Sequence, residues 1–151
     1  MSRQKIVRAV AEYAREVLYE PLGIRGWEIR WMEEPSEEGT FATVLPTDQR
    51  RLARVYVCEG IEKEEPRIIH ETLIHELLHL VHRDQSDVVR LAGTEAGMAK
   101  PAYDVLYECF RIQTELMVDH LASCFAELIR IDKKAMRAIT EQGTERKKNG
   151  N

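Results

Sequence analysis

The sequence is poor in cysteine, and its cysteines are not paired by spacing. The 151 residues contain three, Cys58, Cys109 and Cys124, with no CxxC motif. An odd number without paired spacing argues against a disulfide framework and against a four-cysteine zinc ribbon. We therefore expect three reduced cysteines that fill the core of a cytoplasmic protein.

Long apolar runs and a marked charge imbalance are also missing. The longest stretch without a charged residue runs from Gly39 to Thr47, far short of the roughly 18 apolar residues that a membrane span needs. The basic residues near the start are followed by no apolar segment, so we expect no signal peptide. Lys and Arg number 22 against 26 Asp and Glu, for a net charge of -4. We therefore expect neither nucleic acid nor membrane as a partner.

What is present is an ordinary globular composition, with 44% hydrophobic and 32% charged residues. A chain of this length is typical of one domain with its own core. We expect that domain to cover residues 1–142 and to be followed by a polar, flexible tail over 143–151.

Apolar periodicity predicts an α+β fold. Spacing of three and four residues indicates helices, and alternation indicates half-buried strands. The predicted elements are a helix over 3–19, strands over 27–32, 40–45 and 53–58, a helix over 67–83, a loop over 84–101, a long helix over 102–131 and a short helix over 132–142. Residues 116–126 are apolar on nearly every side, which predicts a buried central helix.

The segment 75–79, His-Glu-Leu-Leu-His, is an HExxH motif inside a predicted helix. Four residues of helix rise about 6 Å and turn by about 400°, so His75 and His79 project from one face. Two such imidazoles can bind one metal ion, and zinc is the usual one. Glu76 lies about 100° around the helix, where its carboxylate can take a proton from a zinc-activated water.

A catalytic zinc site usually has a third protein ligand. Glu115 and Asp119 are spaced i and i+4 on a largely apolar helix, and burying them without partners would be costly. We predict Glu115 as the third ligand and Asp119 as the acceptor that orients a ligating histidine. The alternative is a solvated polar stripe, because Glu108 and Arg111 share that face.

Together, the HExxH motif at 75–79 and the ExxxD pattern at 115–119 resemble the gluzincins, the thermolysin-like zinc metallopeptidases. The resemblance is greatest to short predicted metallopeptidases of bacterial and phage genomes, and it covers residues 27–130 in architecture. It implies a zincin-like fold, a Zn²⁺ cofactor, Glu76 as general base and a peptide or protein substrate. It also implies that an edge strand before the active-site helix holds the substrate in an extended conformation.

The larger gluzincins carry a further domain with a His or Tyr that stabilises the oxyanion, and no such domain fits in this chain. Substitutes come from five residues: Tyr103, Tyr107, Arg111, His82 and His120. The missing domain motivates an alternative function, a regulatory or interaction module that binds zinc with weak turnover. An interaction protein without metal and a zinc hydrolase acting on another bond are further alternatives.

The remaining polar candidates have simpler interpretations. We expect His70 to be structural, since it falls away from the zinc face, and His120 to be buried and hydrogen-bonded. His82 caps the helix or meets the substrate. Arg54 and Tyr56 line a peptide cleft if their strand is an edge of the sheet, and otherwise form a plain exposed face.

Overall fold

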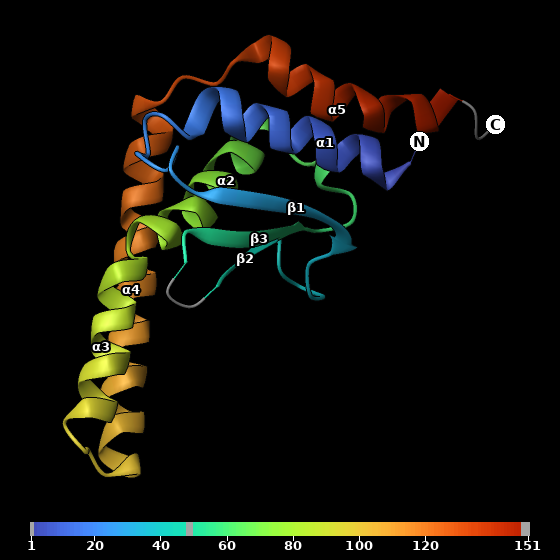
Figure 1. The fold of residues 1–151 in the computed structure, drawn as a ribbon. Coiled ribbons are helices and arrows are strands. Elements are labelled where there is room, and N and C mark those ends of the chain that lie inside the picture. Colours follow the sequence, from blue (N-terminus) through green and yellow to red (C-terminus); the bar gives the residue numbers. More distant parts are fainter. Residues whose placement is uncertain (1, 48–49, 149–151) are drawn as a thin grey trace.

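The computed structural model describes residues 2–47 and 50–148, and its class is α+β. A three-stranded sheet carries helices over one face, and a helical hairpin extends away from it (Figure 1). The helices are α1 (Arg3–Tyr13), α2 (Pro66–Val81), α3 (Arg83–Glu95), α4 (Lys100–Leu128) and α5 (Lys133–Lys148). The strands are β1 (Glu28–Pro35), β2 (Ala42–Pro46) and β3 (Leu52–Val57), and two short turns are η1 (Ala14–Leu18, π-helical) and η2 (Ile61–Lys63, 3₁₀).

The strands lie in the order β1-β3-β2, with β1 parallel and β2 antiparallel to β3. The segment predicted at 53–58 is therefore the central strand, and the condition under which Arg54 and Tyr56 would line an edge cleft is not met. Their side chains lie on the face opposite the buried Ala53, Val55 and Val57. The edge strand next to α2 is β2.

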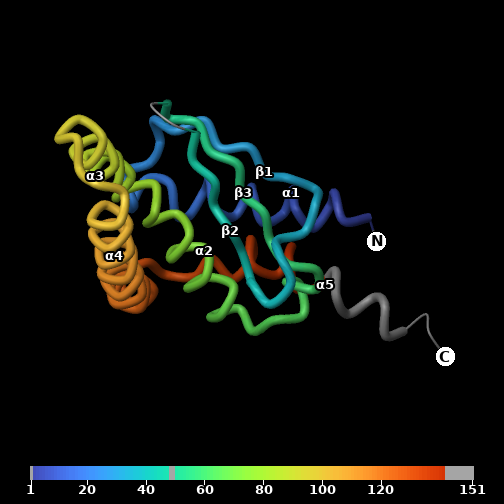
Figure 2. The backbone as a smooth tube through the Cα atoms, turned by 90° about the horizontal axis from the view of Figure 1, so that it is seen from below, coloured from blue at the N-terminus to red at the C-terminus, as the bar shows by residue number. Residues whose placement is uncertain are grey.

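Helices α1 and α2 cover the apolar face of the sheet, and α5 packs on α1 (Figures 1 and 2). The largest fully buried side chains come from these layers and the segments between them; they include Tyr13, Leu18, Ile24, Ile61, Leu73, Ile74, Leu77 and Ile139. This core holds α2 firmly in place.

A buried hydrogen-bonded chain joins α1, α2 and the end of α4. His70 Nδ1 lies 2.7 Å from the Tyr13 hydroxyl, and His70 Nε2 lies 2.9 Å from the Ile129 carbonyl oxygen. His70 is fully buried, which confirms its structural role. Burial lowers the pKa of this imidazole, because the charged form would lose its hydration.

The prediction of a loop over 84–101 is wrong for most of its length, because residues 83–95 form α3. The residues before Gly93 permit a helix, and the chain reverses only at residues 96–99. There Gly97 has φ 60°, and the N–H groups of Gly97 and Met98 bond to the carbonyls of Thr94 and Gly93. This is a Schellman ending, which favours glycine. Pro101, the last residue of the predicted loop, lies in the first turn of α4.

We call residues 83–128 the arm and the other described residues the body. The arm consists of α3, the turn and α4, lying side by side and pointing away from the sheet (Figures 1 and 2). Its two helices approach closely where the Tyr103 ring packs on Gly93: a Cβ at Gly93 would lie 2.2 Å from Tyr103 Cδ2.

The prediction that 116–126 is a buried central helix is wrong. Only Val118 and Ala122 of α4 are buried, since one face of the helix packs on α2 and the rest meets solvent. Leu116, for example, is 59% exposed.

Two smaller predictions about α4 are wrong for the same reason. His120 is exposed, and its Nε2 lies 3.9 Å from the Cys124 sulfur. Cys109 and Cys124 are also exposed, so neither fills the core, whereas Cys58 is partly buried against it.

The C-terminal helix is longer than predicted. It continues through Lys148, past the expected boundary at residue 142, and the last residues of the expected tail, 149–151, lie outside the described part of the chain. Across the described residues, no helix combines the length and apolarity needed to cross a membrane.

Candidate metal centre

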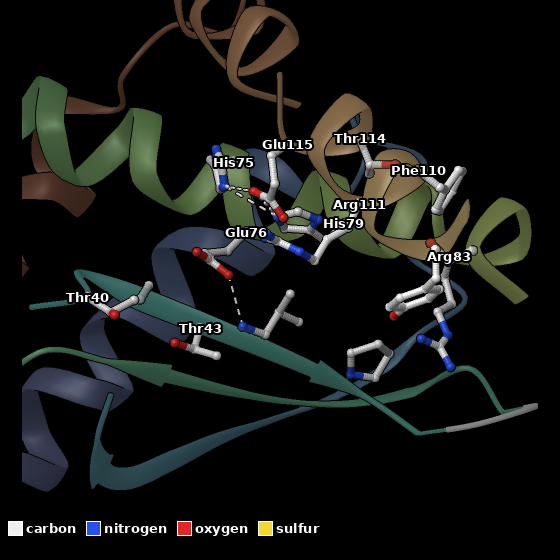
Figure 3. A pocket seen from close by; sticks show the side chains of 15 residues that line it. Thr40, Thr43, His75, Glu76, His79, Arg83, Phe110, Arg111, Thr114 and Glu115 are labelled. Atoms are coloured by element: carbon white, nitrogen blue, oxygen red, sulfur yellow. Dashed lines mark hydrogen bonds and ion pairs between the residues drawn. The ribbon is translucent and has the colours of Figure 1, made fainter. Parts of the chain in front are cut away.

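Two imidazoles of α2 and one carboxylate of α4 converge at the junction of body and arm. The Nε2 atoms of His75 and His79 lie 3.3 Å apart, and Glu115 Oε2 lies 3.7 Å from each of them (Figure 3). Among the described residues, these three are the group of His, Cys, Asp or Glu side chains that could hold a metal ion. The predicted ligand set is thus brought together in space.

The local sequence explains how α2 presents its histidines. Pro66 occupies the first turn, where its missing N–H costs no hydrogen bond. The apolar residues Leu73, Ile74, Leu77 and Leu78 are buried, so the helix cannot rotate without exposing them. The face of α2 that carries His75 and His79, one turn apart, therefore points towards α4.

Asp119 stands where a carboxylate that orients a ligand is expected. Its Oδ1 lies 3.0 Å from His75 Nδ1. A hydrogen bond there places the proton of neutral His75 on Nδ1 and leaves the Nε2 lone pair directed at Glu115 and His79. The structure thus brings Asp119 to His75, and its role in orienting a metal ligand stays a prediction.

The donor set fits a tetrahedral metal ion. A zinc ion bound to its ligands at about 2.0–2.1 Å needs donor atoms roughly 3.3 Å apart, close to the separations between the three donors here. Two imidazoles and one carboxylate are also a common catalytic zinc set, and three ligands leave one position for water. Burial lowers the pKa of His79, although Glu115 acts in the opposite direction, and so favours the neutral imidazole that metals bind.

Glu76 lies beside the three ligands, between α2 and β2 (Figure 3). Burial raises the pKa of its carboxyl group to about 7; the nearby Glu115 also raises it, and a hydrogen bond from the Val44 amide opposes the rise. The Val44 N–H donates to Glu76 Oε2 across 2.9 Å. A carboxyl group with this pKa can both accept and release a proton near neutral pH.

A groove runs along the outer edge of β2 on both sides of Glu76. One hollow of about 470 Å³ extends towards Pro46 and the arm, where Arg83, Tyr107 and Arg111 contribute to its wall. A second hollow of about 460 Å³ extends towards Gly39. His75 and Glu76 line both hollows, so the candidate metal centre lies where the two meet.

The five predicted oxyanion candidates separate clearly in the structure. Tyr107 and Arg111 line the groove. Tyr103 stacks on Tyr107 and covers Gly93 instead. His82 and His120 line neither of the two hollows.

His82 lies between α2 and α3, and its side chain makes no capping hydrogen bond. Its Nε2 is buried without a hydrogen-bond partner among the described residues. It therefore occupies the predicted cap position without using its side chain as a cap.

Two features of the site were not predicted from the sequence. The Val44 amide has no signal in the sequence, because its side chain takes no part in the hydrogen bond to Glu76. Glu71 lines the second hollow one turn before His75; its spacing of four residues from His75 could have indicated the shared face.

Comparisons with known proteins add no relative. No protein-family model, no curated protein and no solved structure matches this chain. The likeness to gluzincins therefore depends on the two motifs and on the geometry described above.

Proposed function

We propose that this protein is a zinc-dependent metallopeptidase with a zincin-like fold. The observation that carries the proposal is the convergence of His75 and His79 with Glu115 from a separate helix, with Glu76 beside them. A structural zinc site would be closed by four protein ligands, whereas three ligands facing a groove are typical of a catalytic site.

The chemistry divides between the metal and Glu76. A bound zinc ion supplies a Lewis acid that acidifies water and polarises a carbonyl oxygen. Glu76 accepts a proton from the attacking water and later donates it to the departing nitrogen. Its pKa of about 7 suits both steps. The Val44 amide holds one carboxylate oxygen, so the side chain keeps one orientation.

The outer edge of β2 supports a peptide as the substrate. Alternate residues of β2 turn their backbone groups towards β3, as the Phe41 carbonyl and the Thr47 amide do in the flanking positions. The backbone groups of Ala42 and Val44 therefore face the groove. The Ala42 N–H and the carbonyls of both residues can bind an extended peptide as a further strand, while the Val44 N–H is engaged by Glu76. Antiparallel pairing is the more stable, and it would place the C-terminal part of the peptide at the Gly39 end.

Tyr107 and Arg111 are the proposed donors to the oxyanion, because both line the groove. Arg111 is held in place by Glu108, with nitrogen-to-oxygen distances of 2.7 and 3.0 Å.

The predicted cytoplasmic location also remains a proposal; it is supported by the three free cysteines, two of them exposed.

The test is the zinc-loaded variant Glu76→Gln. It should keep stoichiometric zinc, measured by elemental analysis, and lose peptide hydrolysis by several orders of magnitude. Undiminished turnover would reject the mechanism. Zinc binding by a wild-type protein that cleaves nothing in a broad peptide screen would favour the zinc-binding module. A wild-type protein purified without chelators and free of zinc would remove both functions.

A further inference from the structure

The second hollow contains one carboxylate that the proposed reaction does not use. Glu71 lies on α2 one turn before His75 and lines the hollow together with His75, Glu76 and Asp119. Much of the remaining wall is small, including Gly39 and Ala122, which leaves room for a long side chain beside Glu71.

The other two carboxylates of this hollow are engaged. Asp119 contacts His75, and Glu76 accepts the Val44 amide. Glu71 accepts a hydrogen bond from the neutral Ser123 hydroxyl, and its carboxylate forms no ion pair with a lysine or arginine of the described residues. No lysine or arginine of the described chain lines the hollow.

The first hollow differs in this respect, because two arginines, Arg83 and Arg111, line it together with Glu76 and Glu115. Arg83 is paired with Asp87 at 2.9 Å, and Arg111 is paired with Glu108 at 2.7 Å. The groove is therefore electrically uneven, with its negative end on the side of Gly39.

A third hollow adjoins the second and extends the negative surface. It has a volume of about 400 Å³, shares Gly39 and Thr40 with the second hollow, and is lined by three acidic residues, Glu37, Glu38 and Glu59. The charged side chains that line this third hollow are all acidic, so the negative potential extends from it to Glu71.

We propose that the second hollow is a subsite for a lysine or arginine side chain of the substrate, and that Glu71 determines this specificity. The stem of such a side chain would lie along the small residues of the wall, with its charged end at the Glu71 carboxylate. With the peptide antiparallel to β2, the basic residue follows the cleaved bond. This inference rests on the proposed peptidase function.

The first experiment measures cleavage. Zinc-loaded protein is incubated with a mixture of synthetic decapeptides of randomised centre, and mass spectrometry identifies the cleaved bonds. Lys and Arg should be enriched after the cleaved bond. In a matched peptide pair, Lys should raise kcat/KM about tenfold over norleucine, the effect of one partly screened charge pair. Salt should reduce this preference.

Variants of Glu71 tie the preference to one side chain. Glu71→Gln should remove the difference between the Lys and norleucine peptides, and Glu71→Lys should favour Glu at the same position. Glu12→Gln is the matched control, because it removes the same charge from an exposed position on α1, and it should keep the wild-type preference. Thermal melts verify that each variant is folded.

The second experiment measures binding without turnover. Zinc-loaded Glu76→Gln should bind the fluorescent Lys peptide about tenfold more tightly than the norleucine peptide, and adding Glu71→Gln should remove the difference. Binding of this kind without any cleavage by the wild type would refute the peptidase and leave the subsite standing. Equal cleavage of both peptides, equal binding, or no binding of either would overturn the subsite.

Discussion

Helices α2 and α4 meet at the same candidate metal centre, but they are packed very differently. Seven of the 16 residues of α2 are buried, against two of the 29 residues of α4 and one of the 13 residues of α3. The histidines therefore stand on a helix fixed by the core of the body, while Glu115 and Asp119 stand on the thinly packed arm. The difference suggests that the body is organised before metal binds and that the metal itself ties down the arm.

The largest expected effect is that of the metal. Zinc at a thousandfold excess over its Kd should raise the free energy of unfolding by about 4 kcal/mol. Hydrogen exchange should show new protection in α4 around Glu115 and little change in α2, because thinly packed segments open locally most often. Equal protection of the two helices would contradict the comparison. Glu115→Ala, which removes the ligand of the arm, should abolish the new protection.

Truncating a leucine in each region should give unequal losses. In metal-free protein, Leu73→Ala should cost about 2–5 kcal/mol of stability, since Leu73 is fully buried in α2. Leu116→Ala removes the same atoms from a 59% exposed position in α4 and should cost at most about 0.5 kcal/mol. Urea denaturation of both variants measures the difference, and similar losses would mean that the arm is packed as firmly as the body.

The internal contact of the arm gives a smaller effect. Gly93→Ala places a methyl group against the Tyr103 ring, so α3 and α4 must separate or the ring must turn. We expect a loss of about 1–3 kcal/mol and weaker zinc binding, measured by calorimetry, because α4 carries Glu115. Combining the change with Tyr103→Ala should relieve the clash and restore zinc affinity. An unaffected single variant would show that the ring moves freely.

The smallest expected effect is on the stability of the body at acidic pH. Burial lowers the pKa of His70 below its ordinary value of 6.5. At pH values between the folded and unfolded pKa of His70, the unfolded chain binds more protons than the folded one. The neutral, buried His70 therefore contributes fully to stability above about pH 6.5, and this contribution is lost as the pH falls. Urea denaturation of metal-free protein between pH 7.5 and 5 should show a shallower loss for His70→Gln than for the wild type. Identical slopes would contradict the assignment.

The sequence was most informative where one element contains the whole pattern. His75 and His79 lie within a single helix, so their spacing alone sets their common direction. Glu115 and Asp119 likewise share one helix, and both lie close to the histidines because α4 packs against α2. The three strands were predicted from alternation, within a few residues of their observed bounds.

The features that the sequence did not predict concern relations between elements. The order of the strands depends on pairing, which alternation does not encode, so the central place of β3 could not be foreseen. The apolar run in α4 predicted burial, but apolar composition does not say whether a partner surface covers each face. The loop predicted over 84–101 could not show that Gly93 lies within α3, where the absence of a side chain lets the Tyr103 ring pack against the helix.

The hydrogen bond between Val44 and Glu76 makes the register of the sheet part of the chemistry. The register pairs Val44 with Val55, and it is this pairing that turns the Val44 amide outward. A slip of one residue would present Thr43 or Leu45 instead and exchange the two faces of β2. The length of the connection between β2 and β3 is therefore under the same constraint as the HExxH motif, although it contains no reacting group.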